Sequence, residues 1–225
     1  MLASVADLAE AKLAVAWGAD FVDLKNPSMG ALGAWKLDDA RAAVASIGGH
    51  RPVSATIGDL PMRPDLVAEH SAAMADTGVD IVKVGFFGSG DTAGCAAALE
   101  PLAARGVRLV AVMMADQAPD LSVVPLLAAA GFYGVMLDTA DKSAGGLRQH
   151  QNEQQLTAFL ALARANGLLT GLAGSLGLLD IGLLSALRPD YLGFRGALCR
   201  GGRMAGLHRD AFRAVRGALD LRLAA

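Results

Sequence analysis

Short apolar runs alternate with longer Ala- and Leu-rich segments along the whole chain, and this alternation restricts the fold more than any other feature. The runs are rich in β-branched residues and have the length of strands, whereas the longer segments repeat apolar residues at helical spacing. We predict strands over residues 2–5, 21–25, 53–57, 81–85, 109–114, 133–137, 168–173 and 191–195. The predicted helices between them include residues 7–17, 38–46, 64–75 and 153–165.

Eight strand–helix units in a chain of 225 residues are typical of one α/β fold, the (β/α)8 TIM barrel. We therefore predict a single TIM-barrel domain over residues 1–225. An open doubly wound sheet is the alternative. It is disfavoured because no Gly-x-Gly-x-x-Gly motif follows the first strand and no Walker-type phosphate loop occurs in the sequence.

Three segments repeat one pattern, in which a helix end is followed by a turn with aspartate and then by a strand. They are GADFVDLK at 18–25, GVDIVKVG at 78–85 and RPDYLGFRG at 188–196. Such a repeat suits a fold built from successive βα units. Aligning the three segments predicts that Lys83 lies level with Asp23, and Arg195 level with Lys25.

Charge and composition exclude several classes of partner. A net charge of −2 lacks the basic excess of a nucleic-acid-binding protein, so we expect no nucleic-acid partner. The longest uncharged stretch, residues 121–137, is interrupted by proline and glycine, so we expect no membrane span.

Acidic residues precede the first cation, which is unlike a signal peptide. The distant Cys95 and Cys199 suit a reducing compartment, and we expect a cytoplasmic location.

The unusual polar residues gather where the predicted strands end. Asp23 and Lys25 share one face of the second strand, and Lys83 lies between valines in the fourth. Asp138 ends the sixth strand and Lys142 follows it. Because the catalytic residues of a TIM barrel lie at the carboxyl ends of its strands, we expect these side chains to meet at one mouth of the barrel.

Only five of the twenty cationic residues are lysines, and Lys25 and Lys83 lie in or directly after apolar runs, where a positive charge is costly to bury. A buried lysine close to another cation loses basicity. Its neutral amine can attack a carbonyl carbon and form a Schiff base, and a second such lysine can accept a proton. We predict this chemistry for Lys25 and Lys83. The alternative is that each lysine extends to solvent and that Asp23 and Lys25 form a plain ion pair.

Glycine-rich loops follow the last two predicted strands. Gly174 and Ser175 come after the seventh strand, and Arg195 and Gly196 come after the eighth. In many TIM barrels these two loops bind a phosphate through backbone N–H groups, and arginine adds a bidentate contact. We therefore predict a phosphate site there. The alternative is that the glycines only form turns and that Arg203 is solvated.

A metal site is not expected. The histidines, His50, His70, His150 and His208, fall in predicted helices or their flanks. Asp59 and Asp116 lie near the ends of the third and fifth strands, and with the other strand-end aspartates they could bind Mg²⁺. Nearby lysines would compete for these carboxylates.

Together these stretches resemble the (5-formylfuran-3-yl)methyl phosphate synthase family of methanofuran biosynthesis. The resemblance rests on GADFVDLKNPSMGALG (18–33), SATIGD (54–59), DIVKVG (80–85), MLDTADK (136–142), LAGS (172–175) and GFRGALCRGGR (193–203). The segments AGGLRQHQ (144–151) and VMMAD (112–116) depart from the family pattern. These departures affect the loop contacts rather than the two lysines.

The resemblance implies an enzyme that condenses two molecules of glyceraldehyde 3-phosphate into a furan aldehyde phosphate, with release of phosphate and two waters. It implies no cofactor, because the reaction is redox-neutral. By motif, Lys25 is the Schiff-base lysine, Lys83 is the proton acceptor, and Asp23, Asp138 and Lys142 support them. Gly174, Ser175, Arg195 and Gly196 are expected to hold the retained phosphate.

Two other functions stay open on the sequence alone. One is a class I aldolase-type barrel acting on another sugar phosphate, and the other is a non-catalytic barrel that binds a phosphorylated metabolite. The Ala- and Arg-rich composition suits a bacterial member with a role in one-carbon metabolism. We also expect a homo-oligomer, with Trp17 or Trp35 at the interface.

Overall fold

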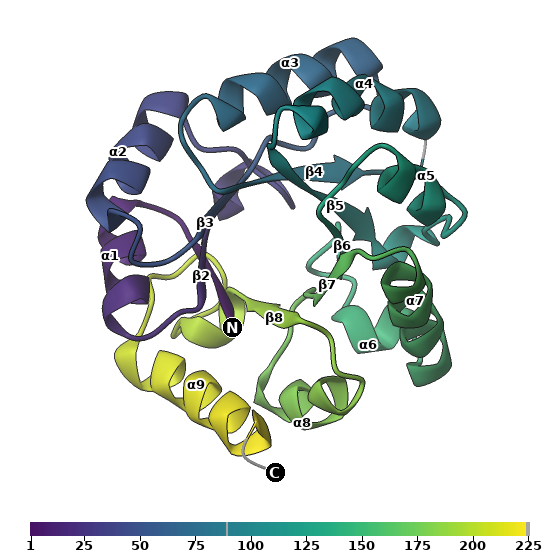
Figure 1. Ribbon diagram of the computed structural model, residues 1–225. Coiled ribbons are helices and arrows are strands. Elements are labelled where there is room, and N and C mark those ends of the chain that lie inside the picture. Colours follow the sequence, from purple (N-terminus) through teal and green to yellow (C-terminus); the bar gives the residue numbers. More distant parts are fainter. Residues whose placement is uncertain (89, 224–225) are drawn as a thin grey trace.

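A closed barrel of eight parallel strands forms the centre of the molecule (Figure 1). The computed structural model describes residues 1–88 and 90–223. Each strand pairs with the next in the chain, and the last pairs with the first, so the predicted (β/α)8 TIM barrel is confirmed. The strands are β1 (Leu2–Val5), β2 (Phe21–Leu24), β3 (Val53–Thr56), β4 (Ile81–Phe86), β5 (Arg108–Met114), β6 (Gly134–Asp138), β7 (Leu169–Leu172) and β8 (Tyr191–Phe194).

Helices surround the barrel on its outer side (Figure 1). The α-helices are α1 (Leu8–Ala16), α2 (Leu37–Ile47), α3 (Pro64–Ala75), α4 (Thr92–Ala104), α5 (Val123–Ala129), α6 (Leu147–His150), α7 (Glu153–Ala165), α8 (Leu178–Ala186) and α9 (Arg209–Leu223). Short 3-10 helices follow three strands: η1 (Pro27–Met29), η2 (Ala115–Gln117) and η3 (Gly196–Leu198). All eight predicted strands, and the four predicted helices, end within one residue of the prediction. The extent of the domain over 1–225 stays a prediction, since residues 89, 224 and 225 lie outside the described part.

Local capping explains several of these boundaries. Asp7 accepts a hydrogen bond from the backbone N–H of Glu10 and so begins α1. Asn152 and Gln155 form a reciprocal capping box at the start of α7. Helix α2 ends at Gly48, whose left-handed φ of 58° suits glycine. These caps fix the first residue of α1 and α7 and the last residue of α2. They therefore also fix where the loops to the neighbouring strands begin or end.

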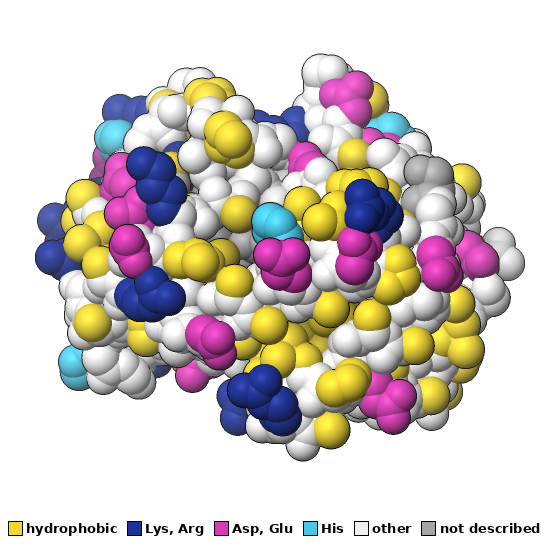
Figure 2. All heavy atoms as spheres, turned by 90° about the horizontal axis from the view of Figure 1, so that it is seen from above, with side chains coloured by type: hydrophobic (Ala, Val, Ile, Leu, Met, Phe, Trp, Pro, Cys, Tyr) yellow, Lys and Arg dark blue, Asp and Glu magenta, His cyan; other side chains and the backbone are white. Residues whose placement is uncertain are grey.

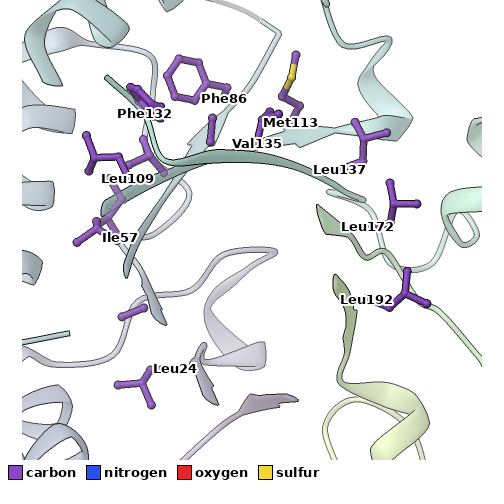
Figure 3. Packing of buried hydrophobic residues seen from close by; sticks show 14 of the residues in the cluster. Leu24, Ile57, Phe86, Leu109, Met113, Phe132, Val135, Leu137, Leu172 and Leu192 are labelled. Carbon is purple, nitrogen blue, oxygen red and sulfur yellow. The ribbon is translucent and has the colours of Figure 1, made fainter. Parts of the chain in front are cut away.

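Apolar side chains on the outer side of the strands form the main core, between the barrel and the helices. Figure 3 shows side chains of this core along the strands from β2 to β8, among them Leu24, Phe86, Met113 and Leu172. The rings of Phe86 and Phe132 meet edge to face, with centroids 5.8 Å apart. This layer fixes the helices, and hence the loops that leave the strand ends.

The interior of the barrel changes from apolar to polar along the strands. Phe21, Ile81, Val110 and Tyr191 fill the end at which the strands begin, and the rings of Phe21 and Tyr191 lie 5.7 Å apart. Tyr191 has room there because the neighbouring β7 residue is Gly171. Polar and charged residues occupy the other end, so the strand-end mouth holds the candidate site.

The strand register corrects both expectations from the repeated segments. Asp23 pairs with Ser54, and Ser54 pairs with Ile81, so Lys83 lies two residues farther along than the alignment predicted. Leu2 pairs with both Phe21 and Gly193, so Arg195 lies level with Asp23 and not with Lys25. The strands of a barrel are staggered, and repeated units therefore do not share one level. The long side chain of Lys83 nevertheless reaches back to Asp23.

The surface and the two tryptophans can be compared with the partners expected from the sequence. On the face in Figure 2, side chains of both charges are interspersed with apolar ones. No helix within the described residues is long and apolar enough to cross a membrane. Trp35 is buried in the core, so its predicted place at an interface is wrong. Trp17 packs edge to face against Phe212 and is half-buried. The homo-oligomer itself stays a prediction.

The first testable prediction concerns Gly171. A Cβ at this position would lie 2.3 Å from Cζ of Tyr191, which is far inside van der Waals contact. We expect Gly171→Ala to lower the free energy of unfolding by about 1–3 kcal/mol, measured by urea denaturation. Gly217→Ala is the matched control, because a Cβ at Gly217 in α9 meets nothing within 4 Å. That change should raise stability by about 0.5–1 kcal/mol, and equal effects of the two changes would contradict the packing argument.

Candidate active site

A cavity of about 380 Å³ opens at the carboxyl ends of the strands. This volume lies within the usual range for small-molecule sites. Eight of the nine predicted site residues line it: Lys25, Lys83, Asp138, Lys142, Gly174, Ser175, Arg195 and Gly196. The ninth, Asp23, is completely buried next to Lys83. The structure thus brings together residues from β2, β4 and β6 and from the loops after β6, β7 and β8.

The first charged pair joins β2 and β4 inside the barrel. Nζ of Lys83 donates to Oδ1 of Asp23 at 3.0 Å, and the two side chains are 2% and 0% exposed. The hydroxyls of Ser54 and Ser4 also donate to Asp23, each at 2.7 Å. Every oxygen of this carboxylate is therefore occupied, as a buried charge requires.

These contacts shift the pKa values of Asp23 and Lys83. Burial raises the pKa of Asp23, but Lys83, Lys25 and the two serine hydroxyls outweigh it and hold that pKa below its usual value. Burial lowers the pKa of Lys83, and Lys25 lowers it further, while Asp23 offsets only part of this shift. Lys83 is thereby suited to accept a proton.

The second charged cluster centres on Asp138 at the end of β6. Its Oδ2 accepts from Nζ of Lys25 at 3.1 Å, and its Oδ1 accepts from Nζ of Lys142 and from the backbone N–H of Thr139. Burial opposes the charge of Asp138, but Lys25 and Lys142 lower its pKa strongly. One carboxylate thus bridges two amines.

Lys25 and Lys142 respond differently to this shared carboxylate. Burial lowers the pKa of Lys25, but Asp138 and Asp23 outweigh burial and raise it above the usual value. Burial and Lys25 keep the pKa of Lys142 below its usual value. The expectation of reduced basicity therefore holds for Lys83 and not for Lys25, because two carboxylates face Lys25.

Arg195 lines the cavity, but its guanidinium pairs with a carboxylate of the protein. Its guanidinium forms a two-point ion pair with Glu10 of α1, and both side chains are 9% exposed. The same guanidinium donates to the backbone carbonyls of Ser4, Arg203 and Ala205. Arg195 therefore lines the cavity while it ties the loop after β8 to β1 and α1. Glu10 could not be recognised from the sequence as the partner of Arg195, because an acid three residues after an N-cap is also a normal feature of a helix start.

The glycine loops present backbone N–H groups near the cavity. Gly174 and Ser175 have positive φ values of 108° and 49°, which turn the chain sharply after β7. Among the described residues, no protein acceptor receives the backbone N–H groups of Gly174, Ser175, Gly196 or Ala197. All four residues line the cavity, and such N–H groups are suited to bind a phosphate.

The two remaining strand-end aspartates bind the backbone instead of meeting the others. Asp59 accepts from the N–H groups of Ala31 and Leu32, and so fixes the loop after β2. Asp116 accepts from the N–H groups of Ala140 and Asp141, and so fixes the loop that carries Lys142. Within residues 1–88 and 90–223, no three His, Cys, Asp or Glu side chains form a group that could hold a metal ion.

A second testable prediction follows from the ion pair of Glu10 and Arg195. Removing one partner of a buried ion pair costs about 3–5 kcal/mol, because the other charge is left buried alone. We expect Glu10→Gln and Arg195→Met each to lower the unfolding free energy by about this amount, and the double variant to lose less than the sum. Calorimetry or urea denaturation measures the cycle.

The exposed pair of Asp38 and Arg41 is the matched control for this cycle. Its side chains are 94% and 50% exposed, so Asp38→Asn should cost less than about 1 kcal/mol. If Glu10→Gln lowers the free energy of unfolding no more than Asp38→Asn does, the buried ion pair of Arg195 does not stabilise the fold as we expect.

Comparison with known proteins adds independent evidence. A family model described as 4-HFC-P synthase matches residues 1–216. The chain is 36% identical over 227 residues to the (5-formylfuran-3-yl)methyl phosphate synthase of Methanosarcina mazei, covering 93% of this chain and 94% of that protein. A relative from Methylorubrum extorquens, which carries the same name provisionally, is 44% identical over 200 residues, covering 89% of this chain and 82% of that one.

A solved structure is similar in fold. The 3-hexulose-6-phosphate synthase of Salmonella typhimurium superposes with a TM-score of 0.69 at 16% identity, and the match covers 98% of each chain. At this identity the likeness supports the barrel fold alone. The match of the family model over nearly the whole length, together with relatives above 30% identity, shows that the chain belongs to the 4-HFC-P synthase family.

Proposed function

We propose that the protein is a (5-formylfuran-3-yl)methyl phosphate synthase of methanofuran biosynthesis, and that it condenses two molecules of glyceraldehyde 3-phosphate through a Schiff base at Lys25. The observation that carries the proposal is that two buried lysines, Lys25 and Lys83, line one cavity, and each pairs with a different carboxylate. The family membership and the names of the relatives support the same reaction.

The first step needs Lys25 without its proton, and the contacts around Asp138 supply a route. Asp138 accepts hydrogen bonds from both Lys25 and Lys142, and the pKa of Lys142 is lowered by burial. The lowered pKa lets Lys142 lose its own proton more readily, and neutral Lys142 can then take the proton of Lys25 along these hydrogen bonds. This transfer is uphill because Lys25 is the more basic amine, and the attack on the carbonyl that follows draws it forward. The neutral amine of Lys25 then attacks the carbonyl carbon of one triose phosphate, and loss of water gives an iminium.

The next steps use Lys83 as the proton acceptor. The iminium draws electrons from the adjacent carbon, and Lys83 removes the proton there to give an enamine. The enamine carbon attacks the aldehyde of the second triose phosphate. Elimination of phosphate and water, release of Lys25 and ring closure give the furan. The balance is two triose phosphates to one furan aldehyde phosphate, one phosphate and two waters.

The phosphate that the product retains would be held chiefly by backbone groups. The N–H groups of Gly174, Ser175, Gly196 and Ala197 are the candidates, because they line the cavity and no described protein acceptor receives them. Arg195 affects this site indirectly, because its hydrogen bonds to the carbonyls of Arg203 and Ala205 position the loop after β8. A cytoplasmic location and a lyase mechanism without a cofactor belong to the same proposal.

A third testable prediction separates the two lysines. With glyceraldehyde 3-phosphate and borohydride, we expect an adduct on Lys25 in the native protein and no turnover in Lys25→Arg, since guanidinium cannot form the imine. Lys83→Arg should still give the trapped adduct but no furan. Mass spectrometry of digested protein locates the adduct, and ultraviolet absorption detects the furan.

Lys12→Arg is the matched control for this experiment, because Lys12 is exposed on α1. It should retain both adduct and product. Trapping without a furan chromophore in the native protein would favour an aldolase-type reaction. Absence of any adduct would favour a phosphometabolite-binding protein, and an adduct at another lysine would overturn the assignment of Lys25.

A further inference from the structure

The cations that line the cavity differ in their partners. They are Lys25, Lys83, Lys142, Arg195 and Arg203. The first four each contact a carboxylate: Asp138 binds Lys25 and Lys142, Asp23 binds Lys83, and Glu10 binds Arg195. Within the part of the chain that the structure describes, Arg203 has no carboxylate within ion-pair distance. Its positive charge is therefore left for a ligand.

Neutral groups hold Arg203 in place. Nη2 of Arg203 donates to the carbonyl oxygens of Pro27 at 3.1 Å and Gly30 at 2.9 Å, in the loop after β2. Its own backbone carbonyl accepts from Nε of Arg195 at 2.9 Å. The side chain is half-buried and is fixed at both ends, so its guanidinium is already ordered before any ligand binds.

The remaining donors of this guanidinium suit a phosphate. Arginine carries five N–H donors in a planar fork, and Nη2 alone contacts the two carbonyl oxygens. Among the described residues, Nε and Nη1 of Arg203 donate to no protein acceptor. Both parallel donor pairs of a guanidinium include Nη2, whose two N–H groups are already used here, so Nε and Nη1 would bind a phosphate through single charge-assisted hydrogen bonds.

The proposed reaction needs a second place for a phosphate. Two triose phosphates must lie in the cavity together, whereas the loops at Gly174 and Gly196 supply one set of backbone donors. We propose that Arg203 forms a second anion subsite, on the β2 side of the mouth, which binds the phosphate of the second triose phosphate. This inference rests on the proposed function for the identity of the ligand, but not for the presence of an anion subsite.

The first experiment counts phosphate ions on the intact protein by isothermal titration calorimetry with inorganic phosphate. The test variant is Arg203→Gln, which removes the charge. Its shorter side chain cannot reach the carbonyls of Pro27 and Gly30, so Arg203→Lys, which keeps a positive charge, is the conservative variant and should still bind the second phosphate. We expect two bound phosphates in the native protein and one in Arg203→Gln. Arg200→Gln is the matched control, since Arg200 lies in the same loop and is 71% exposed. It should leave the count at two.

The second experiment separates binding of the first and second substrate. Arg203→Gln should retain the borohydride-trapped adduct on Lys25, which needs one triose phosphate. It should lower kcat/KM for furan formation by about 10- to 100-fold, the size of one lost charge-assisted hydrogen bond. An unchanged phosphate count with unchanged kcat/KM overturns the subsite, and so does a loss of adduct as large as the loss of furan.

The two experiments also distinguish this inference from the proposed function. If the native protein forms neither adduct nor furan, the proposed function fails, and the phosphate count still decides whether Arg203 binds an anion. If the native protein forms the furan and Arg203→Gln equals Arg200→Gln in every measurement, only the inference about Arg203 fails.

Discussion

The burial of two carboxylates among three lysines is the constraint on which the rest of the site depends. Buried charges are stable only when they are paired and hydrogen-bonded. Asp23 satisfies this with Lys83 and two serines, and Asp138 satisfies it with Lys25 and Lys142. Because the strands of the barrel supply both carboxylates, the fold itself fixes the positions of all three amines.

The pairs Lys25–Asp138 and Lys83–Asp23 differ in how strongly carboxylates offset burial, and the two lysines therefore differ in basicity. Both carboxylates act on Lys25 and raise its pKa, whereas burial dominates at Lys83 and lowers its pKa. Lys83 is therefore the less basic of the two amines and the more readily deprotonated, which suits it to the role of proton acceptor. Lys25 must first give up its proton, and Asp138, whose pKa is too low to keep a proton, connects it by hydrogen bonds to Lys142. In the mechanism we propose, the nucleophile Lys25 is thus protonated before the substrate binds.

Much of the fold was predictable, because the apolar runs and helical segments alternate without interruption. The strand-end rule also brought Lys25, Lys83, Asp138 and Lys142 to one cavity correctly. The pKa direction of Lys25 was not predictable, because it depends on how closely Asp138 approaches across the barrel. The partner of Arg195 was missed for a related reason, since 185 positions separate Glu10 from Arg195 in the sequence. Local pattern places a residue on an element, but the contacts between distant elements decide its charge and its role.

Direct titration of the lysine side chains by NMR tests the central claim. Signals of the Cε methylenes, assigned by comparison with Lys25→Arg and Lys83→Arg, report the protonation of each amine as pH rises. We predict that Lys83 loses its proton at lower pH than a free lysine and that Lys25 loses its proton at higher pH. Titration of the two lysines in the reverse order, or of both at the ordinary lysine value, would contradict the account.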